Sequence, residues 1–92
     1  MFTWINKKSV RSSEGYEVHF LGRFTAQYRE GRRIRTIPIE DGILAGKPAV
    51  LFSRRVFENW DNSSVDNPPD EQDRLLQNFV EALRFQGLEA DY

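Results

Sequence analysis

The sequence predicts an α+β fold, in which an antiparallel β-sheet of about five to six strands is packed by one C-terminal α-helix. Three observations carry this prediction. Residues 1–60 contain mostly β-hairpin patterns, with short stretches of alternating apolar and polar residues separated by turn-forming clusters. Residues 61–69 form a polar, proline-ended loop. Residues 70–86 then repeat apolar side chains at helical spacing.

Chain length and composition indicate one domain that covers residues 1–92. A chain of 92 residues, with 39% hydrophobic and 13% aromatic residues, can bury one compact core. The absence of cysteine excludes disulfides and thiolate metal sites. Neither a signal peptide nor a run of about 20 apolar residues is visible, so we expect a soluble, cytoplasmic protein that does not enter a membrane.

The central hairpin is predicted from alternation. Residues 16–20 have the pattern of a half-buried strand, and residues 24–28 repeat it after a turn. The period of two puts Phe24, Ala26 and Tyr28 on one face, which we expect to point into the core.

The returning strand at residues 32–40 breaks its own alternation. Ile34 lies on one face, whereas Ile37 and Ile39 lie on the opposite one. Pro38 stands between these two isoleucines and cannot donate a hydrogen bond to a ladder. This pattern is compatible with a β-bulge or with an edge strand, and an unpaired edge would allow a homodimer instead of a monomer.

The apolar runs beyond this strand are shorter. After a loop bounded by residues 41–42 and 46–48, the run at residues 49–52 predicts a strand, and residues 56–60 are a further candidate. Trp60 is expected to cap the core, because a tryptophan at a strand end is more often buried than exposed.

The helix at residues 70–86 is the most strongly patterned element. Asp70 is expected to be its N-cap, and Gly87 is placed to end it in a left-handed conformation. Residues 88–92 favour a short terminal strand. One continuous apolar stripe, which needs the sheet for its burial, is formed by Leu75, Leu76, Phe79, Val80 and Leu83.

The charges are distributed unevenly along the chain. Residues 1–55 contain eleven Lys and Arg against five Asp and Glu, a balance of +6. Residues 56–92 contain two against nine, a balance of −7, which returns the net charge of −1. Such an asymmetry favours a surface dipole that can steer a charged partner.

The residues needed for common enzyme chemistry are missing, so we expect no catalytic activity, no metal site and no cofactor. His19 is the only histidine, and its parity within a strand predicts a solvent-facing side chain. Residues 61–67 begin like a calcium-binding loop. The sixth position of that loop is not glycine, however, and Gln72 replaces the bidentate glutamate of the twelfth.

Arginines crowd one predicted hairpin and provide an alternative basic surface, formed by Arg29, Arg32, Arg33 and Arg35. Beside the aromatic rings of Phe24 and Tyr28, such a surface would suit a small module that binds single-stranded nucleic acid. The parity of the two rings and a pI near 5.8 argue against this alternative. A structural or regulatory dimer is the other alternative.

Three segments of the chain resemble a family of small bacterial proteins. They are WINKKSV at residues 4–10, GRFTAQYREGR at residues 22–32 and NFVEALRFQG at residues 78–87. In this order they are similar to the seventy-fourth family of immunity proteins from bacterial polymorphic-toxin systems, short and mostly β proteins with a C-terminal helix. The loop at residues 62–67 is longer than in that pattern.

The resemblance implies a binding protein that neutralises a cognate toxin in the cytoplasm of the producing cell by protein–protein occlusion. Many toxins of this kind are nucleases with basic active surfaces. Charge complementarity then favours the acidic part of the chain as the partner-binding surface. The residues predicted to bind the toxin are Asp61, Asp66, Asp70, Glu71 and Asp73.

Overall fold

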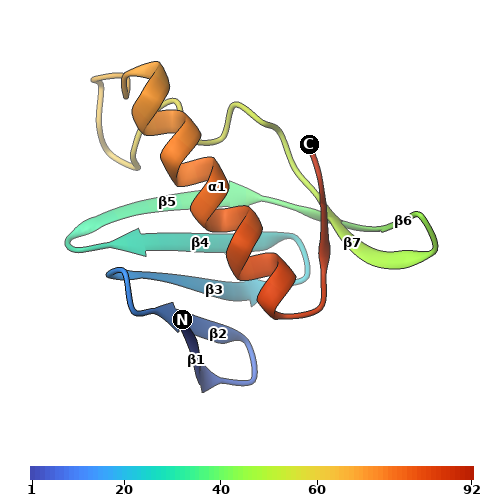
Figure 1. Ribbon diagram of the computed structural model, residues 1–92. Coiled ribbons are helices and arrows are strands. Elements are labelled where there is room, and N and C mark those ends of the chain that lie inside the picture. Colours follow the sequence, from blue (N-terminus) through green and yellow to red (C-terminus); the bar gives the residue numbers. More distant parts are fainter.

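Five of the strands form an antiparallel meander. The computed structural model describes all residues, 1–92, and shows this sheet in the order β1-β2-β3-β4-β5 (Figure 1). Each strand pairs with its neighbour in the chain, as expected for hairpins joined by short turns. The strands are β1 (Phe2–Asn6), β2 (Ser9–Ser12), β3 (Tyr16–Gly22), β4 (Thr25–Glu30) and β5 (Arg33–Pro38).

A second, three-stranded sheet completes the β structure. It contains β6 (Glu40–Leu44), β7 (Lys47–Leu51) and β8 (Glu89–Asp91) in the order β6-β7-β8. The terminal strand that the sequence predicted is therefore confirmed, and it pairs with β7 in parallel. Only Ile39 separates β5 from β6, so the chain passes from one sheet to the other within a single residue. The predicted α+β class, with one C-terminal helix, is confirmed.

Two predictions about residues 40–60 are wrong. The predicted loop around residues 41–48 is a hairpin, in which the turn residues Ala45 and Gly46 have φ values of 51° and 78°. Both values are positive, as a type I′ hairpin turn requires, but alanine is a poor signal for this conformation. The predicted strand at residues 56–60 is a series of turns instead, although it buries Trp60 as expected.

The helix α1 (Pro69–Phe85) begins one residue earlier than predicted. Asp70 is not its N-cap: Pro68 occupies that position and no side chain caps the helix. Proline suits the first helical positions because they have no intrahelical acceptor for their N–H groups. Gly87 has a φ of 80°, which confirms the predicted left-handed residue after the helix. α1 is neither long nor apolar enough to cross a membrane.

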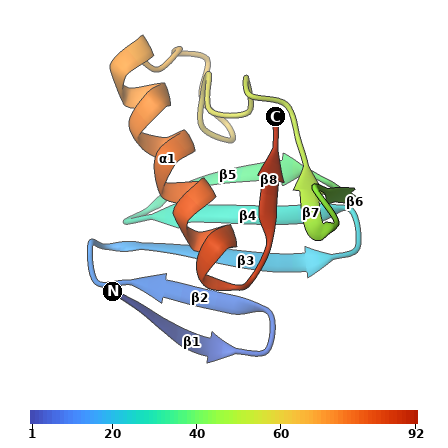
Figure 2. The same cartoon turned by 45° about the vertical axis from the view of Figure 1, so that its right-hand side comes forward.

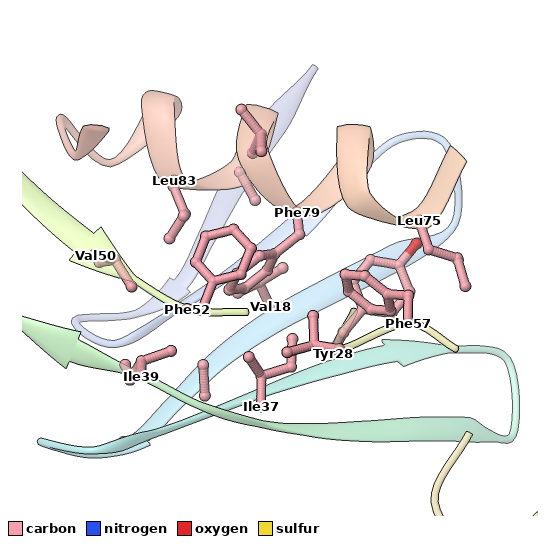
Figure 3. Close-up of a cluster of buried hydrophobic side chains, with 14 of the residues drawn as sticks. Val18, Tyr28, Ile37, Ile39, Val50, Phe52, Phe57, Leu75, Phe79 and Leu83 are labelled. Atoms are coloured by element: carbon pink, nitrogen blue, oxygen red, sulfur yellow. The ribbon is translucent and has the colours of Figure 1, made fainter. Parts of the chain in front are cut away.

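The core lies between the five-stranded sheet and a layer formed by α1 and β8, which cross in front of the same face (Figure 2). Figure 3 shows α1 side chains above those of the sheet, with Phe52 between them. Ala26 and Tyr28 are buried as predicted, but Phe24 is 63% exposed because it belongs to the turn before β4. The predicted helical stripe is buried, except that Leu76 is partly exposed.

Candidate interaction surface

Asp61 is a structural residue and does not belong to an open acidic surface. Its carboxylate accepts hydrogen bonds from the backbone N–H of Thr36 at 3.0 Å and from the Thr36 hydroxyl at 2.6 Å. Its own N–H donates to the carbonyl oxygen of Ile34 at 2.8 Å. The register of β5 against β4 is continuous, so the Pro38-containing strand is an edge strand without a bulge. Asp61 covers the middle of that edge, where a second copy would have to pair in the homodimer that the sequence left open.

We expect Asp61→Ala to lower the free energy of unfolding by about 1–3 kcal/mol, because the Thr36 N–H and hydroxyl lose their acceptor. Chemical denaturation monitored by circular dichroism measures the change. Asp66→Ala is the matched control, because Asp66 is exposed and forms no ion pair, and its effect should stay within about 0.5 kcal/mol. Equal stability of both variants would show that Asp61 is dispensable for the fold.

The other four acidic candidates differ in solvent exposure and in whether they form ion pairs. Glu71 is partly buried and pairs with Arg74 in the first turns of α1. Asp66, Asp70 and Asp73 are exposed, and none of them forms an ion pair in the structure. Asp70 and Asp73 are three residues apart and therefore lie on neighbouring parts of the helix surface. Three of the five predicted carboxylates are thus available to a partner.

The loop before α1 is fixed by hydrogen bonds at its base. Asn67 donates from its backbone N–H to the carbonyl oxygen of Glu58 at 2.6 Å and from its side chain to that of Phe57 at 3.0 Å. Gln72 of α1 donates to the carbonyl oxygen of Asn67 at 2.7 Å. Within the loop, Val65 is 73% exposed. We call Val65, Asp66, Asp70 and Asp73 the acidic loop surface; it lies where the loop meets the start of α1 (Figure 1).

The four arginines of the predicted basic surface do not form one platform. Arg29 pairs in register with Ile34, on the face of the sheet away from α1, and donates to the Gln27 side chain at 2.6 Å. Arg33 and Arg35 alternate onto the other face. Arg32 is exposed in the turn between β4 and β5, and it is the only one of the four without a side-chain hydrogen bond, ion pair or ring contact.

The arginines on the helix side are engaged with neighbouring groups. Arg33 lies 3.1 Å from the Glu30 carboxylate and stacks over the Trp60 ring at 4.6 Å. Arg35 lies 3.5 Å from the carboxylate of Asp61. In the nucleic-acid alternative the Tyr28 ring would lie beside these arginines, but Tyr28 is fully buried, as its parity predicted. The basic half of the chain is therefore partly neutralised within the fold.

Glu30 is the centre of a charged network that the sequence did not reveal. Its side chain is 17% exposed and accepts hydrogen bonds from Arg74 at 2.7 and 3.0 Å. Tyr28 also donates to it at 2.8 Å, and Asn78 of α1 donates to the Tyr28 hydroxyl at 3.0 Å. The Arg74 hydrogen bonds hold the pKa of Glu30 below its ordinary value. The network joins α1 to the end of β4.

His19 lies on the face of the sheet away from α1, as its parity predicted, but its side chain is only 14% exposed. Its Nε2 is 2.7 Å from the Glu17 carboxylate, and Glu17 also pairs with Arg11 at 3.0 Å. The His19 hydrogen bond is the main cause that lowers the pKa of Glu17. No group of three His, Asp or Glu side chains that could hold a metal ion converges in the structure.

Comparison of the chain with protein-family models, with curated protein sequences and with solved structures found no match.

Proposed function

We propose that this protein is an immunity protein that binds a cognate bacterial toxin and blocks it by occlusion in the cytoplasm of the producing cell. The observation that carries the proposal is the acidic loop surface, in which residues 65–73 contain three exposed carboxylates without ion pairs and one exposed apolar side chain, next to a loop base fixed by hydrogen bonds. The resemblance of three chain segments to toxin-immunity proteins supports the same function.

The chemistry of this surface suits a basic nuclease as the toxin. Asp66, Asp70 and Asp73 are negatively charged and form no internal ion pairs. They can therefore attract the positive active surface of a toxin and raise the association rate. Val65 offers exposed apolar contact area in the loop. The hydrogen bonds of Asn67 keep the loop in place before binding, which lowers the entropy cost of association.

Charge reversal of the acidic loop surface tests the proposal. The wild-type protein and the triple variant Asp66→Lys, Asp70→Lys, Asp73→Lys would be titrated against the purified toxin domain encoded beside this gene. We expect the association rate of the variant to fall by about 10- to 100-fold at low salt, because steering is lost. Protection of cells that express the toxin domain should fall with it.

The matched control reverses charge elsewhere on the molecule. Glu14 is exposed in the turn before β3, so Glu14→Lys should leave the association rate nearly unchanged. Circular dichroism confirms that each variant is folded. The proposal fails if the neighbouring gene encodes no toxin domain that binds, or if the triple variant binds as fast as the wild type.

A further inference from the structure

The outer side of β1 is the open edge of the five-stranded sheet. β1 pairs only with β2, whereas Asp61 covers the middle of β5 at the other edge. Every residue of β1 after Phe2 is exposed. Figure 2 shows β1 at the edge of the sheet, beyond the end of α1. An open strand presents unpaired N–H and C=O groups, which can pair with another strand.

The register shows which backbone groups point outward. The carbonyl oxygen of Met1 accepts a hydrogen bond from the N–H of Ser13 at 2.8 Å. Hydrogen-bonded and non-hydrogen-bonded pairs alternate along an antiparallel ladder, so Thr3 faces β2 while Phe2 and Trp4 direct their backbone groups outward. A register shift between Trp4 and Asn6 bends the strand at its far end. A partner strand would therefore pair with the first half of β1.

An aromatic cluster of Phe2, Trp4 and Phe85, which we call the aromatic ledge, lies beside these outward backbone groups. Phe2 stacks on Phe85 of α1 with ring centroids 5.2 Å apart, and Trp4 lies 5.8 Å from the same ring. Trp4 is 49% exposed and Phe85 is 42% exposed, so the ledge offers apolar area next to the open edge. From Trp4 a groove of about 520 Å³ continues past Phe20 and Leu88.

The charges around the ledge are positive. Lys7, Lys8 and Arg23 line the groove, and its one carboxylate, Asp41, lies 3.8 Å from Arg23. Residues 1–13 contain no Asp or Glu, whereas Lys7 and Lys8 follow β1 directly. A second copy of this chain would bring the same cationic segment to the edge. Charge complementarity therefore favours an acidic partner over self-association.

We propose that β1 is a second interaction surface, which takes an extended acidic segment of a partner protein as an added strand. The added strand pairs with the backbone of Phe2 and Trp4, places an apolar side chain on the Trp4–Phe85 ledge and directs carboxylates toward Lys7 and Lys8. This is strand addition at a sheet edge, in which the backbone gives affinity and alternate side chains give specificity. The surface is separate from the acidic loop surface and has the opposite charge.

Nuclear magnetic resonance tests this inference with the intact ¹⁵N-labelled protein. The probe is a short peptide of alternating glutamate and valine, compared with a lysine–valine peptide and with the glutamate peptide N-methylated at alternate residues. We expect the acidic peptide to shift the amide signals of β1 and the Lys7–Lys8 turn at up to low millimolar concentration. The lysine and N-methylated peptides should shift them far less.

Variants separate the two parts of the surface. The double variant Lys7→Glu, Lys8→Glu should lower the affinity for the acidic peptide by at least about tenfold. Trp4→Ala should lower it by about tenfold, and both variant proteins should remain folded. Asp66→Lys should leave peptide binding unchanged. Equal binding of the N-methylated peptide, no shift in β1, or a dimer whose β1 signals change with protein concentration would each overturn the inference. None of these outcomes concerns toxin binding at the acidic loop surface.

Discussion

Phe79→Ala is expected to lower the free energy of unfolding by about 3–5 kcal/mol, the range for removing a fully buried aromatic side chain. Phe79 has no exposed surface. Its ring lies 4.9 Å from that of Phe52, which follows β7, and 6.0 Å from that of Phe57 in the turns before the loop. One side chain thus connects α1 to both segments, and alanine would leave a cavity between them (Figure 3).

Denaturant unfolding, followed by far-ultraviolet circular dichroism and by tryptophan fluorescence, measures this loss. The control is Phe85→Ala in the last turn of the same helix, where the side chain is 42% exposed and about 1 kcal/mol is expected. A change of about 1 kcal/mol or less for Phe79→Ala would mean that the helix contributes little to the core. Separate transitions for the two probes would show that unfolding is not two-state.

The helix could be predicted because its signal is local and repeated. Leu75, Phe79 and Leu83 recur at four-residue spacing, and this stripe is buried as the periodicity requires. The error at its start also has a local cause. Asp70 is a good N-cap by residue type, but Pro69 occupies the first helical position, so the helix begins one residue before the predicted start.

The pairing of β7 with β8 into a second sheet could not be predicted, although strands were expected near both places, because the signals for this pairing are non-local. β8 has only three residues, and its parallel partner β7 lies about forty residues earlier in the chain. The β6–β7 turn uses Ala45 at positive φ, where asparagine or glycine would have given a hairpin signal. Phe24 followed the alternation of β4 but falls in the preceding turn, so the parity rule did not apply to it.

The sequence shows which residues of the candidate surface are charged, but it does not show which of them form ion pairs with one another. The sequence counts Asp61 among the acidic residues and Arg35 among the basic ones, but the fold brings them to 3.5 Å across 26 positions. The same holds for Glu30 and Arg74, which are 44 positions apart. Long-range ion pairs leave no periodic pattern, so only the structure shows that Asp66, Asp70 and Asp73 remain free.

Glu30→Gln is expected to lower the free energy of unfolding by about 2–3 kcal/mol near neutral pH. The glutamine has nearly the same shape, but it removes the negative charge that faces Arg33 and Arg74. Both arginines, whose side chains are 52% and 46% exposed, then lose their charged partner, the Glu30 side chain, which is only 17% exposed. Glu81→Gln is the matched control, because Glu81 is exposed on α1 and should change stability by less than about 0.5 kcal/mol.

The pH dependence separates the charge of Glu30 from its shape. Hydrogen bonds from Arg74 lower the folded-state pKa of Glu30 below the ordinary value of 4.5, so its ionised form stabilises the fold above that pH. The contribution is lost as the pH falls through the folded-state pKa, because the carboxyl is then protonated in both states. The stability difference between wild type and Glu30→Gln should therefore be largest above pH 4.5 and shrink on acidification. The similar contribution of Glu17 is present in both proteins and cancels. A difference that stays constant down to acidic pH would show that packing, and not the ion pair with Arg74, makes Glu30 important.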